Sequence, residues 1–518
     1  MAMRAAYGAA ARLRGEMTRW LEQSVRMDGP GRNRGGEDEA NYALAFAAHY
    51  LVGGGEAVRG RLEELLAALA GWVERDCLRG YEAEAEAHHG TEPFLLFLPR
   101  YLGLFPRDRR ALGLLEGAAR HIGNWGGAPP WYDWGRDVFY SYRIGTRVVG
   151  GDARFDFELA EHFRFIHIAL AAYGFGGDAR YAEWALRYGR ARARRLAEAP
   201  EPLPVLWDLD GRGLAPGDLQ TREQRVMAAE NHHAPGDPLA GVENMLASGA
   251  VHALGDLYAL EKDDIFRRAA RRLVEPLVDH LLDPYADPAA AALMQYRQAF
   301  GDDGLDGRLR RVLAGMPGPE PGEWAMVFPQ GRRRAEPGVG RRNDMIFWGR
   351  WGGDGSVSPS REPSTAALAL AYQLDGDPGH ALRALDTAAD KLHMARRVLR
   401  GGREHTDMGG AVCSVAQGHG RNWGCGAVTG CYAALLLGAR EKMGRLAPLL
   451  EVRDGAGRPL LPEGALSLVR PPVGGDGGEV RFFNGGGEAL RFEWRAEGGE
   501  WKGAELGPGE GADGTLPA

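Results

Sequence analysis

The sequence predicts a mainly α-helical fold, an α/α toroid of six or seven helical hairpins with a small antiparallel β unit after it. One pattern recurs along the chain: an apolar helical stretch, an aromatic residue, a turn rich in Gly and Asp, and then an amphipathic helical stretch. A helix that is apolar on every face is buried, whereas a helix with one polar face lies at the surface. Alternation of the two kinds, joined by short turns, therefore predicts an inner and an outer ring of helices.

The copies of this pattern are unevenly spaced, which argues against a solenoid of equal repeats. Their aromatic residues are Tyr50, Tyr101, Tyr173, Tyr258 and Tyr372, with a weaker copy at Tyr296. Long segments without helical periodicity separate the hairpins at about 122–160, 200–245, 315–364 and 401–424. Long connections in compact domains usually carry function, and these are rich in Trp, Tyr and His.

The two ends of the chain differ from the toroid. Residues 1–35 are predicted as an N-terminal helical extension and residues 36–445 as the toroid. Beyond residue 445 apolar and polar residues alternate, and glycine-rich turns divide the alternating segments. Such alternation is typical of strands. We therefore expect a small β-rich unit over 446–506 and a disordered tail over 507–518.

Composition narrows the class of function. The net charge is −7 and no basic stripe is present, so we expect no nucleic-acid partner. No run of about 18 apolar residues indicates a transmembrane helix, and residues 1–23 lack the apolar core of a signal peptide, so we expect a soluble cytoplasmic protein. Four cysteines without CxxC spacing fit neither a disulfide scaffold nor a zinc site, and we expect no metal and no cofactor.

One short stretch, 230–244, concentrates ionisable and amide side chains. It holds the run Asn231, His232 and His233, and then Glu243, before an apolar helical stretch. Histidine and glutamate are the side chains that most often move protons in enzymes. A dense cluster of polar residues directly before an apolar helix is a plausible position for catalytic residues in an all-helical protein. A zinc site built from these residues is disfavoured, since adjacent histidines rarely converge on one ion.

A second stretch, 124–143, combines three tryptophans with carboxylates and arginines. Indole faces stack on the C–H faces of pyranose rings, and guanidinium groups and carboxylates bind uronate carboxylates and hydroxyls. The segments around 343–351 and 419–423 repeat the mixture. The predicted substrate-binding residues are Trp125, Trp131, Asp133, Trp134, Arg136, Trp348, Trp351, His405, Arg421, Asn422 and Trp423.

The hairpin pattern over roughly 35–440, together with the pair Asn231-His232, resembles the α/α-toroid enzymes that act on polysaccharides. These include lyases of the alginate-lyase type and the six-hairpin glycosidases. In the toroid alginate lyases an adjacent Asn-His pair lies in the cleft, with an Arg and a Tyr nearby. The resemblance implies that Asn231 and His232 belong to the reaction centre, with Tyr142 and Arg143, or Tyr296 and the arginine after it, as partners. The family's local Arg-to-Tyr spacing downstream of the pair is not reproduced in this chain.

Two reactions fit these residues, and the sequence favours elimination by a small margin. β-Elimination in a uronic-acid-containing glycan requires neutralisation of the uronate, for which Asn231 and Arg143 are the candidates. It also requires a base and an acid. His232 or His233 is the candidate base, and Tyr142 the candidate acid.

The alternative is glycoside hydrolysis, for example of an unsaturated uronide, which requires two carboxylates flanking the bond. The carboxylates on the connecting segments are Asp133, Asp137, Glu243, Asp344 and Glu362. A terpene-cyclase-like toroid is a less favoured alternative, because the DxDD motif of those enzymes is absent. A non-catalytic glycan-binding scaffold is also less favoured. His88 and His89 precede a helix and could line the rim. The expected partner is an acidic oligo- or polysaccharide, and the oligomeric state stays open.

Overall fold

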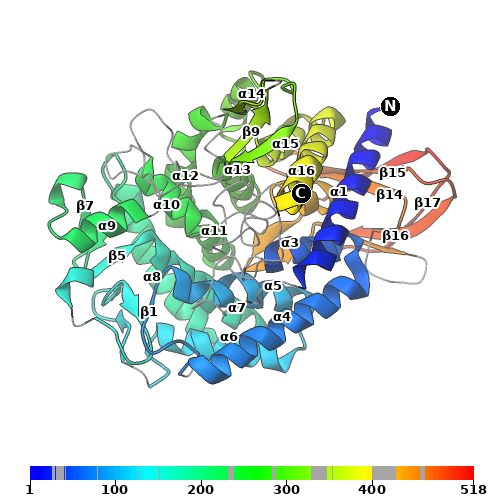
Figure 1. Cartoon of the computed structure of the whole chain (residues 1–518). Coiled ribbons are helices and arrows are strands. Elements are labelled where there is room, and N and C mark those ends of the chain that lie inside the picture. The colour runs from blue at the N-terminus through cyan, green and yellow to red at the C-terminus, as the bar shows by residue number, and fades with distance from the viewer. Residues whose placement is uncertain are drawn as a thin grey trace.

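The predicted mainly α fold is confirmed. The structure is a computed structural model, and it describes residues 1–25, 30, 40, 42–78, 80–127, 129–150, 152–230, 239–282, 287–327, 347–352, 354–398, 428–454 and 461–517. Within these ranges the chain forms six hairpins, in each of which a buried helix is followed by a more exposed one. Figure 1 shows the helices arranged around a ring, with the strands of the C-terminal unit beside it.

The inner ring consists of helices that are buried on nearly every face. Each packs against the next, from α3 to α5, α7, α11, α13 and α15, and α18 packs against α3. Alanine and leucine dominate them, as in α15, where residues 365–374 are all buried. The inner helices are α3 (Tyr42–His49), α5 (Leu98–Leu104), α7 (Phe163–Gly176), α11 (Ala250–Glu261), α13 (Asp287–Phe300), α15 (Thr365–Asp375) and α18 (Tyr432–Leu437).

The outer helices are amphipathic, and one of them is the N-terminal helix. α1 packs along α16 and touches α3, so it closes the ring. Residues 2–24 are therefore part of the toroid, where the sequence suggested an extension. The outer helices are α1 (Ala2–Ser24), α4 (Gly55–Asp76), α6 (Arg109–Ile122), α8 (Ala179–Glu198), α12 (Asp264–Val274), α14 (Asp306–Leu313) and α16 (Pro378–Val398).

The recurring aromatic and Asp residues have a structural explanation at the turns between inner and outer helices. The Tyr101 hydroxyl, near the end of α5, donates to the Asp108 carboxylate at 2.9 Å. That carboxylate also accepts from the backbone N–H of Arg110 and of Ala111, which caps α6. Free N–H groups at a helix start are stabilised in this way. The pattern therefore specifies both the end of one helix and the start of the next.

Short helices and small sheets occupy the connections. The short helices are η1 (Tyr50–Gly54), η2 (His89–Thr91), η3 (Pro93–Phe97), η4 (Ala153–Phe155), η5 (Ala160–His162), η6 (Pro216–Asp218), η7 (Glu275–His280), α9 (Arg222–Glu230) and α10 (Ala240–Ala247). Antiparallel pairing joins β1 (Ala85–Glu86) to β4 (Arg143–Ile144), and β2 (Tyr132–Asp133) to β3 (Val138–Phe139). Two three-stranded sheets have the orders β5 (Phe157–Leu159), β6 (Leu206–Asp208), β7 (Gly213–Leu214) and β10 (Val357–Pro359), β9 (Phe347–Trp351), β8 (Trp324–Val327).

A hairpin of β11 (Arg440–Lys442) and β12 (Arg445–Ala447) follows α18 and packs against α5, α11 and α13. The Glu441 carboxylate pairs with the buried Arg100 of α5, and the Gln295 side chain donates to the Glu441 carbonyl oxygen at 3.1 Å. The backbone N–H of Met443 donates to Asp256 of α11 at 2.9 Å. The hairpin therefore joins helices from different parts of the inner ring.

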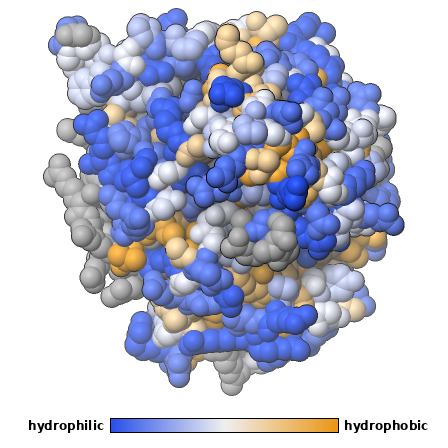
Figure 2. All heavy atoms as spheres, turned by 90° about the vertical axis from the view of Figure 1, so that its right-hand side faces the viewer, coloured by the Kyte–Doolittle hydropathy of each residue, from blue (hydrophilic) through white to orange (hydrophobic). Residues whose placement is uncertain are grey.

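The C-terminal unit consists of two three-stranded antiparallel sheets with an apolar cluster of their own. Its strands are β13 (Leu450–Asp454), β14 (Ala465–Arg470), β15 (Gly478–Asn484), β16 (Leu490–Ala496), β17 (Lys502–Leu506) and β18 (Gly511–Leu516). β18 pairs with β15, so the expected disorder of 507–518 is wrong for residues 511–516. The glycine-rich sequence did not indicate this strand. Its last residue, Leu516, is buried in the apolar cluster. The face on this side of the molecule is mostly hydrophilic (Figure 2).

Candidate functional site

The connections that lead into inner helices are long, and those that leave them are short. The short turns are 105–108, 177–178, 262–263, 301–305 and 376–377. The long connections include 77–92, 123–162, 199–239 and 314–364. Because inner and outer helices alternate in direction, the described parts of these long connections lie at one end of the ring, here named the long-connection end. Loops on a rigid scaffold are where binding and catalytic residues concentrate.

Charged and amide side chains are buried at this end, where inner helices begin. They are Glu92 before η3, Glu161 in η5, Arg164 in the first turn of α7, and Glu243 and Asn244 in α10. Each is at most 2% exposed. Charged side chains are almost never fully buried unless they are paired. This set therefore marks the candidate site.

Arg164 ties two connections together. Its Nη1 donates to Oε1 of Glu92 at 2.8 Å and to the carbonyl oxygen of His88 at 2.6 Å. The same His88 lies beside Glu161, with Nδ1 of the ring 3.4 Å from the carboxylate Oε1. The turn that carries His88 is also held by the hydroxyl of Thr91, which donates to the His88 carbonyl oxygen at 2.9 Å. Glu161 and His88 are thus brought together from connections 73 residues apart.

Tyr142 and Arg143 lie next to this group, Arg143 on β4 and Tyr142 directly before it. The pairing of β4 with β1 places Arg143 opposite Glu86. The Tyr142 hydroxyl donates to the Glu86 carboxylate, and Arg143 forms an ion pair with Glu84 at 2.5 Å. Since Glu86 is two residues before His88, Tyr142 belongs to the same end of the ring as Glu161.

Glu243 reaches the group through α10, which packs against η5. Glycine permits the close approach of α10 to the preceding connection. A Cβ atom on Gly241 would lie 2.1 Å from the carbonyl oxygen of Leu203. The first turn of α10 therefore lies directly against the chain at Leu203, which leads into β6, the partner of β5.

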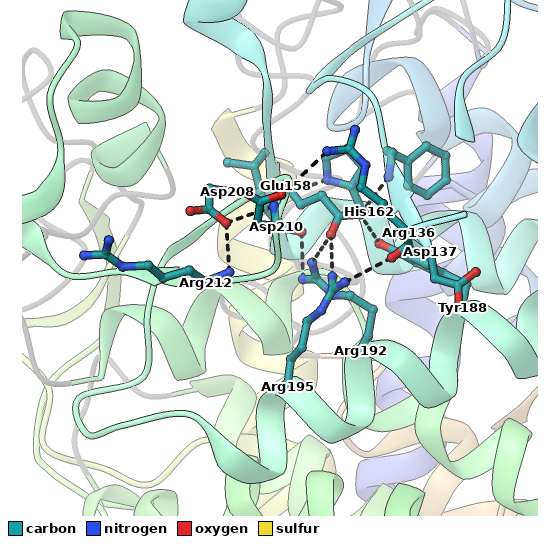
Figure 3. A network of polar contacts seen from close by, with 12 residues as sticks. Arg136, Asp137, Glu158, His162, Tyr188, Arg192, Arg195, Asp208, Asp210 and Arg212 are labelled. Carbon is teal, nitrogen blue, oxygen red and sulfur yellow. Dashed lines mark hydrogen bonds and ion pairs between the residues drawn. The ribbon is translucent and has the colours of Figure 1, made fainter. Parts of the chain in front are cut away.

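Glu158, three residues before Glu161, is a fully buried hub (Figure 3). Its carboxylate accepts from the Phe139 N–H at 3.0 Å and from the Tyr188 hydroxyl at 2.9 Å. Arg192 and Arg195 reach it from α8, each at 3.0 Å. Burial alone would raise the pKa of Glu158, but the two arginines and His162 outweigh it and hold the pKa below its usual range. The network fixes β5 and η5 to α8.

Two tryptophans of the stretch 124–143 do not gather at these residues. Trp125 and Trp134 lie against outer helix α8, with the Arg180 and Arg187 guanidinium carbons each 5.5 Å from the respective ring centroid. Arg180 is in the first turn of α8. Arg192, which contacts Glu158, comes twelve residues later, about 18 Å further along the helix. The predicted role of Trp125 and Trp134 in substrate binding therefore stays a prediction.

Four further residues of this stretch have partners within the fold. Trp131 is fully buried, and its Nε1 donates to the Gly145 carbonyl oxygen at 2.9 Å. This corrects the prediction that Trp131 binds substrate, because a fully buried indole offers no face to a sugar. Asp133 and Arg136 form an ion pair with each other at 2.9 Å. Asp137 pairs with Arg187 of α8 at 2.5 Å.

The sheet of β8, β9 and β10 holds the next predicted group. Trp348 is buried against Trp324, whereas Trp351 is 47% exposed. Glu362 pairs with Arg350 and, at 3.1 Å, with Arg383 of α16. Burial alone would raise the pKa of Glu362, but these hydrogen bonds hold it low. Glu362 therefore anchors the sheet, and its role as a candidate acid or base stays a prediction.

The remaining predicted site residues lie outside the described residues. They are Asn231, His232, His233, Asp344, His405, Arg421, Asn422 and Trp423. Of the predicted catalytic residues, the structure places Tyr142, Arg143 and Glu243, and it places all three at the long-connection end.

Four residues of the site were missed by the sequence analysis: Glu86, Glu92, Glu161 and Arg164. A signal was present for two of them. Arg164 stands between phenylalanines in the run 163–168, and Glu92 stands directly before the apolar run 93–98. A charged residue within an otherwise apolar segment is expected to be buried, and a buried charge requires a paired partner. Neither sequence position shows that the two residues pair with each other.

Within the ranges that the structure describes, no group of three or more His, Cys, Asp or Glu side chains is arranged to hold a metal ion. Among the helices of the same ranges, none combines the length and the apolar character needed to cross a bilayer.

Comparison with known proteins adds one distant structural likeness. No protein-family model matches the sequence, and no curated protein is matched by it. The cellobiose 2-epimerase of Spirochaeta thermophila DSM 6192 is similar in structure over 73% of this chain and 97% of its own. The sequence identity is 13% and the TM-score 0.40, and a likeness this low carries no argument about activity.

Proposed function

We propose that the chain is a carbohydrate-active enzyme that hydrolyses a glycosidic bond, with Glu161 and Glu243 as its paired carboxylates. The observation that carries the proposal is the packing of α10 against η5, which places both carboxylates on adjacent elements at the long-connection end. They are 2% and 1% exposed. Glycoside hydrolysis needs one carboxyl group to protonate the leaving oxygen and a second to act as base or nucleophile.

We assign the proton-donor role to Glu161. Its Oε1 lies 3.4 Å from Nδ1 of His88, so a proton can be shared between the carboxyl group and the imidazole. The ion pair of Arg164 with Glu92 holds the turn that carries His88. Glu243 is then the base or nucleophile on the adjacent helix.

The proposed substrate class is a uronic-acid-containing oligo- or polysaccharide. Arg143 motivates this choice, since its side chain is 41% exposed, stacks on the Phe155 ring with its guanidinium carbon 4.2 Å from the centroid, and forms an ion pair with the exposed Glu84. An exposed ion pair contributes little stability, so a uronate can replace Glu84 as the partner of the guanidinium at small cost.

β-Elimination is the second candidate reaction, and one observation favours it. Tyr142 is 4% exposed and its hydroxyl donates to the Glu86 carboxylate, which supports it as the group that would give a proton to the leaving oxygen. In this mechanism Asn231 neutralises the uronate and His232 or His233 removes the C5 proton. The carboxylate pair of Glu161 and Glu243 favours hydrolysis, because elimination does not require two carboxylates.

A substrate panel tests the proposal. The purified chain is incubated with uronate-containing oligosaccharides, saturated and unsaturated, and both reducing ends and unsaturated-uronide absorbance are followed. New reducing ends without new absorbance, or loss of existing absorbance, are expected for hydrolysis. New absorbance would establish elimination and make Tyr142 the acid. If no glycan in the panel is cut, the proposed function is contradicted.

A further inference from the structure

His162 is buried between the segment that carries Glu161 and the segment that carries Arg143, and the proposed function uses both residues. It is 0% exposed, and its ring packs against Phe139 with 5.0 Å between ring centroids. The neighbouring residue in the chain is Glu161, whose carboxylate faces His88. A buried imidazole that occurs beside a candidate catalytic carboxylate needs an explanation, because burial of its charged form is costly.

The hydrogen bonds of His162 define its state. The backbone N–H of Leu159 donates to Nδ1 at 3.0 Å, so Nδ1 carries no proton. Nε2 therefore carries the proton and donates to the carbonyl oxygen of Ser141 at 3.3 Å. Burial lowers the pKa of His162, and the nearby Glu158 opposes this only in part. The ring is thus a neutral bridge with one acceptor and one donor.

The bridge joins two segments. One end holds the turn of η5, which carries Glu161, and the other holds Ser141, the residue before Tyr142. Glu158 strengthens the same junction, since it binds the N–H of Phe139 on one side and the arginines of α8 on the other. Figure 3 shows His162 and Glu158 in one network.

The backbone N–H of Arg143 donates to the Ser141 hydroxyl at 3.1 Å, so the same bridge reaches Arg143. We propose that His162 is a positioning residue that fixes Glu161 relative to Arg143, the residue that the proposed function assigns to the uronate. The inference rests on the proposed function, because it gives Glu161 a role in the reaction. The ring does not touch substrate in this proposal. A displacement of about 1 Å in a reacting group can lower a rate about 100-fold, so the bond from Nε2 to Ser141 should matter for turnover more than for binding.

Two substitutions separate the two hydrogen bonds. In His162→Asn the side-chain oxygen can still accept from the Leu159 N–H, but nothing reaches Ser141. In His162→Gln the longer amide can still donate to Ser141. We expect kcat to fall about 10- to 100-fold in His162→Asn with KM changed less than about 3-fold, and we expect partial recovery in His162→Gln. Assays are run below the unfolding temperature of each variant.

A buried ion pair elsewhere supplies the matched control. Arg297 and Asp306 form a bidentate ion pair, with distances of 2.6 Å and 2.7 Å. The pair lies beside the short turn 301–305, at the end of the ring opposite the long connections. Asp306→Asn should lower the unfolding temperature and leave kcat of the folded enzyme unchanged. If His162→Asn behaves in the same way, and Glu161→Gln is inactive, the positioning role is overturned and the proposed function stands. If Glu161→Gln keeps full activity, both are overturned.

Discussion

Arg164 illustrates what single residues contribute to this fold and its site. Burying a guanidinium costs several kcal/mol unless it is paired with good geometry. Here a 2.8 Å bond to Glu92 and a 2.6 Å bond to a carbonyl oxygen offset that cost. The charged side chain of Arg164 in an apolar helix therefore holds the chain around His88 against α7.

His49 leads to a pH prediction at this scale. It is 1% exposed, and its Nδ1 lies 3.3 Å from the Tyr432 hydroxyl. Burial, with a contribution from Arg14, lowers its pKa from 6.5 to about 3. The unfolded chain therefore binds a proton at His49 below pH 6.5, whereas the folded protein does so only near pH 3. Stability is lost as the pH falls through this window.

The size of the effect follows from proton linkage. Between pH 7 and pH 5 His49 should account for about 2 kcal/mol of lost stability. His49→Gln, which does not titrate, should flatten the pH dependence of the free energy of unfolding by that amount. Urea unfolding at several pH values measures it. An unchanged slope in the variant would show that His49 titrates normally in the folded protein.

Individual site residues could be predicted from the sequence only in part. Tyr142, Arg143 and Glu243 were singled out, and they do lie at the long-connection end. Trp131 and Glu362 were singled out for their residue type, and the sequence did not show that Trp131 is fully buried or that Glu362 pairs with Arg383. Pairing partners come from distant connections, and one sequence does not reveal them.

At the scale of elements, the β11–β12 hairpin depends on close contact with the inner ring. Gly444 has φ +75°, and a Cβ atom there would lie 2.7 Å from Cβ of Pro99. Gly444→Ala should cost about 2–5 kcal/mol, because backbone strain and steric overlap add. Gly177→Ala is the control, since Gly177 has φ +81° and nothing within 4 Å of the added atom.

The Gly177→Ala control separates the cost of a positive φ at alanine from the cost of the steric overlap with Pro99. Gly177→Ala should cost only about 1–2 kcal/mol. Thermal or urea unfolding of the two variants gives the comparison. Equal losses would mean that the hairpin moves away from Pro99 freely, and that its packing on α5 contributes little to stability.

Elements were the level at which the sequence was most informative. The repeated aromatic and Asp residues predicted the hairpins, because they mark a helix end and a helix cap in the same turn. β18 was missed because its segment, 511–516, is rich in Gly and Asp and its pairing with β15 is a tertiary contact. Local propensity could not anticipate that partner.

For the whole molecule, closure of the ring depends on α1. Glu16 of α1 is buried and binds Arg396 of α16 at 2.6 Å, as well as Arg19 and His393. Glu16→Ala leaves Arg396 without this carboxylate and should cost about 3 kcal/mol. Urea unfolding measures the loss.

An exposed pair provides the comparison for ring closure. Arg59 and Glu63 lie 2.9 Å apart with both side chains nearly half exposed, so Glu63→Ala should change stability by less than about 0.5 kcal/mol. If Glu16→Ala unfolds like Glu63→Ala, the contact between α1 and α16 is not what holds the ring closed.

The grouping of the long connections is also a property of the whole molecule. Alternating helix direction sends the described parts of the long connections to one end, so residues from 77–92, 123–162 and 199–239 can meet although they are far apart in sequence. The sequence predicted these segments and their aromatic content. It could not show which of their side chains turn inward and which lie against α8.

The turnover of Glu161→Gln and Glu243→Gln on a substrate found in the panel tests the central claim most directly. Both variants should lose about 100- to 10,000-fold in kcat, while Glu63→Gln, on the outer surface, keeps wild-type turnover. Circular dichroism confirms that each variant is folded. Wild-type turnover in folded Glu161→Gln and Glu243→Gln would contradict the assignment of these carboxylates and of the long-connection end as the active site.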